Sequence, residues 1–191
     1  MSILRLKILE KIASITERKT LFKGDFTEVK QVTNKGLGIK NHTYLHEANS
    51  QGKKVAILPY RYDKNGNLEY LFRQEIVSAW GTEPKLCAIT GGINKEDGDA
   101  ASGAVRELRE EAGYNIKKDS LLFLGKSKDS KSTDTDYWLF AVDVTDRDHK
   151  KPSGDGTKIE QSAKNIWVKN PDTADPLTAS MAVKLLNKMG E

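Results

Sequence analysis

The sequence predicts an α+β fold with a β-rich N-terminal arm, and three observations support this prediction. Most apolar residues fall in short segments bounded by Gly, Asn and Asp, which is typical of β-strands. Residues 100–112 lie between such segments and have the apolar spacing of an amphipathic helix. A second amphipathic stretch, 177–189, follows the last predicted strand. We therefore expect an arm over residues 1–50 and a larger α+β domain over 51–191.

The predicted arm begins with a short helix over residues 3–14, where apolar side chains recur at helical spacing. Residues 21–34 alternate like a pair of strands around a Gly-Asp turn. Residues 43–49 form a further strand, which ends at the predicted turn over 50–52. The arm is therefore expected to be mainly β-structure.

The larger domain begins with a hairpin of two strands, 54–62 and 68–76, around an Asn-Gly turn. After a loop, residues 86–90 form a short strand that ends at a Gly-Gly pair. The helix over 100–112 is expected to end at Gly113, because glycine readily adopts the left-handed conformation that stops helices. The remaining predicted elements are strands over 121–127, 135–144 and 162–168, a long loop over 146–158 and the closing helix.

The composition is typical of a globular protein and gives no sign of a membrane span. The chain has 191 residues, 37% hydrophobic and 30% charged, which suits a globular protein with a buried core. No apolar run approaches the roughly 20 residues that span a bilayer, and the N-terminus lacks signal-peptide features. The only cysteine, Cys87, lies in an apolar run, which favours a buried thiol and a cytoplasmic protein. The net charge is +4 with scattered lysines, so we expect a solvated surface and no nucleic-acid partner.

The helix over 100–112 carries Glu107, Glu110 and Glu111 near its C-terminal end. Carboxylates are unfavourable there, because the helix dipole is negative at that end and like charges repel within one turn. A hard divalent cation, Mg²⁺ or Mn²⁺, would offset both costs and would favour a phosphate-containing substrate. The alternative is a solvated surface on which Arg106 and Arg109 pair with the glutamates.

At this point the sequence resembles a known family. The pattern of the Nudix box is a Gly, five residues, a Glu and seven residues, followed by Arg-Glu-apolar-any-Glu-Glu-any-Gly-apolar. This chain matches it at Gly92, Arg106, Glu107, Leu108, Glu110, Glu111, Gly113 and Tyr114. The resemblance implies a Nudix-type α/β/α sandwich with a mixed sheet.

One position departs from the box. Gly98 stands where the family has a Glu that braces the loop by pairing with the arginine of the box, here Arg106. We expect either that Asp99 or Glu96 takes over this pairing, or that the brace is lost and activity is weakened.

The resemblance extends, more loosely, to the branch that hydrolyses ADP-ribose and nucleotide sugars. It rests on the strand-rich arm, the strand ending in LFRQE, the Gly-Gly turn and the C-terminal helix. It implies a Mg²⁺-dependent pyrophosphohydrolase, with Mn²⁺ as a second metal, and a homodimer formed through the arm. It also implies that Glu107, Glu110, Glu111 and the carbonyl of Gly91 bind metal, while Arg106 orients the glutamates.

Other candidate site residues lie outside the box. The family's catalytic base often comes from a later loop, where Glu160 and Asp155 are candidates here, although Glu160 fits equally well as the start of a surface strand. Arg73 is a candidate for contact with a phosphate or sugar, or a partner for a neighbouring strand carboxylate. Trp80 is a candidate for stacking on a base or ribose, or for packing in a core or interface. Trp138 and Trp167 lie in predicted strands, and both fit core packing better.

Two alternatives to the ADP-ribose or nucleotide-sugar hydrolase stay open. The first is a catalytically weakened Nudix domain that binds a nucleotide as a sensor or partner module, for which Gly98 is the main support. The second is an RNA-processing Nudix enzyme, which the basic charge permits but no clustered basic helix supports.

Overall fold

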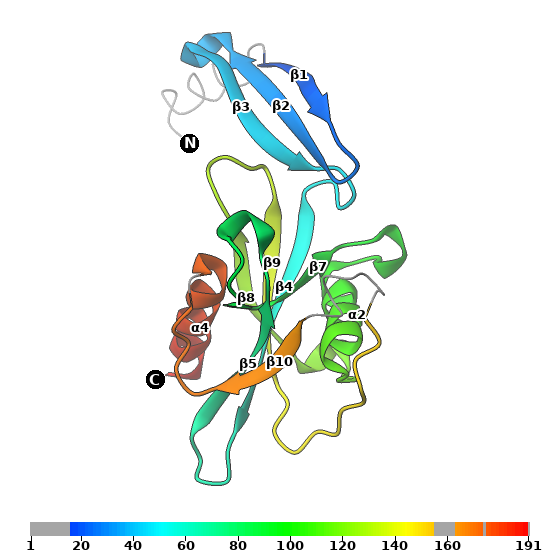
Figure 1. Ribbon diagram of the computed structural model, residues 1–191, viewed down its shortest axis with the longest axis vertical. Helices are drawn as coiled ribbons and strands as arrows, with labels where there is room; N and C mark the ends of the chain where they lie inside the picture. The colour runs from blue at the N-terminus through cyan, green and yellow to red at the C-terminus, as the bar shows by residue number, and fades with distance from the viewer. Residues whose placement is uncertain (1–15, 155–162, 174, 191) are drawn as a thin grey trace, which may run out of the picture. The chain divides into compact units, whose positions relative to one another are not determined.

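The computed structural model describes residues 16–154, 163–173 and 175–190 (Figure 1). The helix predicted over residues 3–14 lies outside the described residues. The chain divides into two compact units. One comprises residues up to Gly52 together with Ser130–Thr135, and the other comprises Lys53–Asp129 and Asp136–Glu191.

The N-terminal unit is a three-stranded antiparallel sheet with the order β1-β2-β3. Its strands are β1 (Thr16–Lys23), β2 (Thr27–Asn34) and β3 (Ile39–Glu47), with the short 3-10 helix η1 (Lys35–Leu37) before β3. The segment 130–135 pairs with β3, because the Leu45 N–H donates to the Ser132 carbonyl at 2.8 Å. The predicted strand pair and third strand are confirmed, and the segment 130–135 belongs to the same unit.

The larger unit is built on a mixed sheet with the order β10-β5-β4-β9-β8, in which β4 and β9 run parallel. Two short strands, β6 and β7, pair with β5 and β4. The strand bounds are β4 (Lys53–Tyr62), β5 (Leu68–Glu75), β6 (Lys85–Cys87), β7 (Ile89–Gly92), β8 (Leu121–Lys128), β9 (Asp136–Asp143) and β10 (Lys164–Val168). The short 3-10 helices are η2 (Ser78–Trp80), η3 (Lys95–Asp97) and η4 (Lys118–Ser120).

Helices α2 (Ala100–Ala112) and α4 (Pro176–Met189) cover opposite faces of this sheet (Figure 1). Alternation along β4 divides the core accordingly, since successive side chains of a strand point to opposite faces. Val55 and Ile57 pack with α2, whereas Ala56 and Leu58 pack with α4. The expected α/β/α sandwich with a mixed sheet is confirmed.

The strand predicted over 86–90 is in fact two strands. The chain leaves β5 after Cys87 and pairs with β4 from Ile89 onward. Thr178 of α4 accepts a hydrogen bond from the Ala88 N–H between them, at 2.7 Å. Cys87 is buried, as expected, and burial raises the pKa of its thiol to about 12. Within the described residues, no helix has the length and apolar character needed to cross a membrane.

Candidate active site

Helix α2 packs on one face of the sheet and carries three carboxylates near its C-terminal end. The Asp99 carboxylate caps its N-terminus by accepting from the Ser102 N–H at 2.7 Å, and Gly113 ends it in the left-handed conformation, with φ of 77°. The apolar stripe lies on the sheet, with Leu108 fully buried. Glu107 and Glu111 are also buried, which a purely solvated acidic surface would not explain.

The Glu107 carboxylate lies directly against the backbone of β7. A Cβ added to Gly91 would come within 1.8 Å of Glu107 Oε1, so only glycine leaves room for this side chain. Burial raises the pKa of Glu107 to about 7, although the nearby Arg106 guanidinium opposes that rise. A carboxylate held in this way benefits from a further positive charge.

Arg106 organises the loop and the carboxylates together. Its Nη1 donates to Glu107 at 2.8 Å and to Glu110 at 3.1 Å, and its Nη2 donates to the Gly92 carbonyl at 2.8 Å. Its remaining partner is Asp97, which accepts from Nε at 2.9 Å and from Nη2 at 3.0 Å. This two-pronged pair is the strongest geometry available to an arginine and a carboxylate.

Asp97 therefore braces the loop, and the expectation that Asp99 or Glu96 would do so is wrong. Asp99 is occupied as the helix cap and pairs with Lys118 at 3.0 Å, while Glu96 is exposed. The brace lies one residue before Gly98, which has a positive φ of 74°, a conformation that glycine adopts easily. The pairing that braces the loop is therefore retained, although Gly98 replaces the family's Glu.

We expect Asp97→Ala to lower the free energy of unfolding by about 2 kcal/mol, because Arg106 loses its two-pronged pair and its half-buried Nε loses its acceptor. Denaturant unfolding measures this change. Glu96→Ala, at the exposed neighbouring position, is the control and should change stability by less than about 0.5 kcal/mol. Equal effects of the two substitutions would contradict the assignment of Asp97 as the brace.

Arg73 contacts the other end of the acidic cluster. It is 6% exposed, its Nε lies 3.3 Å from Glu111 Oε2, and its Nη1 donates to the Glu111 carbonyl at 3.4 Å. Asn165 of β10 donates to the same carbonyl at 2.8 Å, so two side chains satisfy a backbone acceptor near the end of α2. Glu75 is a second carboxylate near Arg73 Nε, at 3.6 Å.

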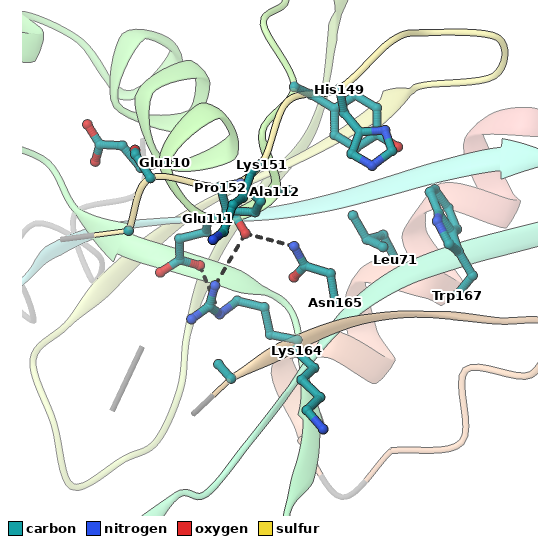
Figure 2. A pocket seen from close by; sticks show the side chains of 15 residues that line it. Leu71, Glu110, Glu111, Ala112, His149, Lys151, Pro152, Lys164, Asn165 and Trp167 are labelled. Carbon is teal, nitrogen blue, oxygen red and sulfur yellow. Dashed lines mark hydrogen bonds and ion pairs between the residues drawn. The ribbon is translucent and has the colours of Figure 1, made fainter. Parts of the chain in front are cut away.

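A cavity of about 820 Å³ opens beside this end of α2 (Figure 2). Arg73, Glu110 and Glu111 line it on one side, and the loop over 149–154 supplies part of its wall. That loop is hydrogen-bonded to α2, because the Gly154 N–H donates to the Glu110 carbonyl at 2.9 Å. The cavity is large enough for a nucleotide-sized ligand.

One candidate residue, Trp80, does not line this cavity. Trp80 lies in η2 and is 48% exposed. Glu160 and Asp155 lie outside the described residues. Sequence reasoning missed four residues that do contribute here, namely Asp97, Asn165, Trp167 and His149. The aspartates flanking Gly98 were the only sequence signal for any of them.

The carboxylate oxygens of α2 are suitable ligands for a divalent cation. Within the described part of the chain, no three His, Cys, Asp or Glu side chains are arranged to hold a metal. Instead, Arg106 lies between the Glu107 and Glu110 carboxylates. The three glutamates and the Gly91 carbonyl are hard oxygen donors, which Mg²⁺ and Mn²⁺ prefer, and the absence of a Cβ at Gly91 keeps the Glu107 carboxylate next to that backbone.

Solved structures share this fold at low sequence identity. The crystal structure of an ADP compounds hydrolase has a TM-score of 0.65 and 17% identity, covering 92% of this chain and 95% of that one. A MutT/nudix family protein from Enterococcus faecalis has a TM-score of 0.52 and 12% identity, covering 100% and 70%. A NUDIX hydrolase from Nitrosomonas europaea has a TM-score of 0.51 and 19% identity, covering 71% and 88%.

Among curated proteins, no sequence match was found. The family model described as NUDIX domain matches residues 52–184, which is well over half of the chain. That match includes every residue of the box, from Gly92 to the buried Tyr114, and the strands that carry the cavity. This chain therefore belongs to the Nudix superfamily.

Proposed function

We propose that the protein is a Mg²⁺-dependent pyrophosphohydrolase that cleaves a nucleoside diphosphate linked to another group. ADP-ribose, giving AMP and ribose 5-phosphate, or a nucleotide sugar is the proposed substrate. The observation that carries the proposal is the buried Glu107 carboxylate held against Gly91, with Glu110 and Glu111 at the rim of the adjacent cavity.

The proposed metal ligands are Glu107, Glu110, Glu111 and the Gly91 carbonyl. A divalent cation bound there supplies charge neutralisation for the diphosphate and an activated water. The chain's own contribution is orientation. Arg106 is fixed by Asp97 and the Gly92 carbonyl, so it holds the first two carboxylates in place. Asn165 and Arg73 hold the last turn of α2, where Glu111 lies.

The proposal also includes two substrate contacts and a cytoplasmic location. Arg73 lines the cavity beside Glu111, which supports a contact between its guanidinium and a phosphate of the substrate. Trp80 is exposed, as a residue that stacks on a base or ribose must be before the ligand binds. The single cysteine is buried, which supports a cytoplasmic location.

The proposed catalytic base is Glu160, with Asp155 as the second candidate. Glu160→Gln should lower kcat about a hundredfold, because a positioned general base contributes at least that much. Mn²⁺ affinity, measured by titration calorimetry, should stay unchanged because the α2 carboxylates remain. Asp155→Asn is the matched control. A larger loss of kcat with that variant would identify Asp155, and not Glu160, as the catalytic base.

The test of the function is turnover of a defined panel. The full-length protein is incubated with Mg²⁺ and ADP-ribose, nucleotide sugars, NADH or dinucleoside polyphosphates, and phosphatase-sensitive product is measured. We expect turnover of ADP-ribose or a nucleotide sugar that is lost on chelation. If none of these compounds is hydrolysed but a nucleotide binds, the chain is instead a binding module. The intact Asp97 brace argues against that alternative.

We propose that the homodimer forms through the N-terminal sheet. Phe22, Val29 and Leu45 lie opposite one another across its three strands, and Phe22 and Leu45 are 63% and 45% exposed. Light scattering of the intact chain should give twice its 21.3 kDa mass, and Phe22→Lys with Leu45→Lys should halve that mass. Val183→Lys, at a 59% exposed position of α4, is the control. A monomeric unmodified chain refutes the dimer.

A further inference from the structure

The cavity beside α2 has two chemically different sides (Figure 2). On one side lie Glu110 and Glu111, and Arg73 lies 3.3 Å from Glu111. Lys151 and Lys164 also line the cavity. On the other side lie the side chains of Leu71, His149 and Trp167, and the Tyr114 ring packs against the His149 ring. Asn165 lies between the two sides, where it donates to the Glu111 carbonyl. A diphosphate suits the first side, whereas the second suits a flat and less polar group.

Two side chains of the aromatic side, Tyr114 and His149, are held in place by contact with each other. The Tyr114 ring is 4% exposed and lies 5.1 Å from the His149 ring, measured between centroids. The two residues also form a backbone bridge, which ties the loop over 149–154 to the residue that follows α2. This wall is therefore part of the folded unit and does not require a ligand to assemble it.

Trp167 is fixed in a different way. The guanidinium carbon of Arg61 lies 4.0 Å from the centroid of its ring, and the Arg61 Nη2 lies 2.8 Å from a Glu69 carboxylate oxygen. In the sheet, Trp167 is directly opposite Leu71. Both residues line the cavity, and Trp167 is two residues along β10 from Asn165, so the same strand face carries both.

We propose that this aromatic side binds a nucleobase of the substrate, so that the larger unit itself recognises the nucleoside half. The inference rests on the proposed function, which supplies a substrate containing both a base and a diphosphate. Aromatic side chains bind bases by stacking, and stacking tolerates different bases because each has a flat face. A ribose or sugar phosphate presents mainly hydroxyl groups, for which Leu71, Tyr114 and Trp167 provide few partners. Trp167 is therefore the main residue on this side that favours a base over a sugar.

Binding of the two product halves tests the proposal without turnover. AMP and ribose 5-phosphate are titrated separately into the full-length protein by calorimetry. We expect AMP to bind at least tenfold more tightly. Trp167→Ala should weaken AMP binding about tenfold, which is the scale of one lost base stack, and should leave ribose 5-phosphate unchanged. Trp138→Ala is the control, since Trp138 also lies in the sheet beneath a cation, Lys126 at 4.3 Å, but does not line the cavity.

Trp167→Leu keeps apolar volume without a ring, and it replaces the alanine variant if that variant does not fold. Equal affinity for AMP and ribose 5-phosphate overturns the proposal, and so does unchanged AMP affinity in the folded Trp167 variant. If AMP binding depends on Trp167 but no panel compound is hydrolysed, the proposed function fails and the base site stands. If ADP-ribose is hydrolysed but its KM is insensitive to Trp167, the base site fails and the proposed function stands.

Discussion

Substitution of Glu111 by Gln is expected to lower kcat for Mg²⁺-dependent hydrolysis by about a thousandfold, because a preorganised charge at the reacting centre contributes on that scale. Glu111 is 7% exposed and lines the cavity. Glutamine keeps the size of the side chain and removes the charge that a divalent cation needs. Steady-state hydrolysis of the best panel substrate and Mn²⁺ titration of the free protein measure the two consequences, and both should change.

A second carboxylate provides the control. Arg73 lies 3.3 Å from Glu111 and 3.6 Å from Glu75, so Glu111→Gln also removes one of its two charged neighbours. Glu75→Gln removes the other neighbour and leaves all three proposed ligands intact. It should lower the free energy of unfolding by less than about 1 kcal/mol, because this 3.6 Å ion pair is partly exposed, and it should keep its Mn²⁺ affinity. An activity within threefold of the unmodified enzyme in Glu111→Gln would sink the metal assignment.

Helix α2 was predictable from sequence because its signals are local. Gly113 is a helix stop whose role follows from its own chemistry, and the structure has it. Asp99, one of the residues expected to brace Arg106, is the helix cap instead, a role that is common for aspartate. The apolar spacing between them sets which side is buried. The bounds of this helix, 100–112, and the crowding of its glutamates could therefore be predicted from one stretch of chain.

The brace and the division of residues 86–90 were not predictable to the residue. Asp97 and Asp99 lie on either side of a positive-φ turn at Gly98 and are chemically equivalent in sequence, but only Asp97 pairs with Arg106. Similarly, the apolar run around Ala88 is continuous, so it does not reveal that the chain exchanges one neighbouring strand for another there. Both outcomes depend on which backbone groups are available elsewhere in the fold.

The cavity wall was beyond sequence reasoning for a related reason. Leu71, Tyr114, His149 and Trp167 come from four separate segments, and only strand pairing and the loop after β9 bring them together. His149 has no metal-ligand spacing, and Trp167 has the pattern of an ordinary strand residue. Their contribution depends on non-local contacts, which periodicity along one segment does not encode.

Substitution of Gly91 by Ala is expected to lower activity about a hundredfold, because a displacement of about 1 Å at a catalytic group has an effect of this size. The new Cβ would lie 1.8 Å from Glu107 Oε1 and 1.9 Å from its Cδ, so the carboxylate must leave its position against β7. Stability should be affected less than activity, because the end of a glutamate side chain moves more easily than the backbone does. We expect the free energy of unfolding to fall by about 1 kcal/mol, at the lower end of overpacking costs.

A double-mutant cycle with Glu107→Ala isolates that contact. Glu107→Ala removes the atoms that the new Cβ would meet, so adding Gly91→Ala to it should cost almost no further stability. Additive losses would mean that the β7 backbone itself cannot accept a side chain at Gly91, independently of Glu107. The comparison rests on residues in direct contact, for which coupling of about 0.5–3 kcal/mol is ordinary. Coupling in stability, with activity lost in both single variants, would establish that Gly91 serves the site by making room for the Glu107 carboxylate.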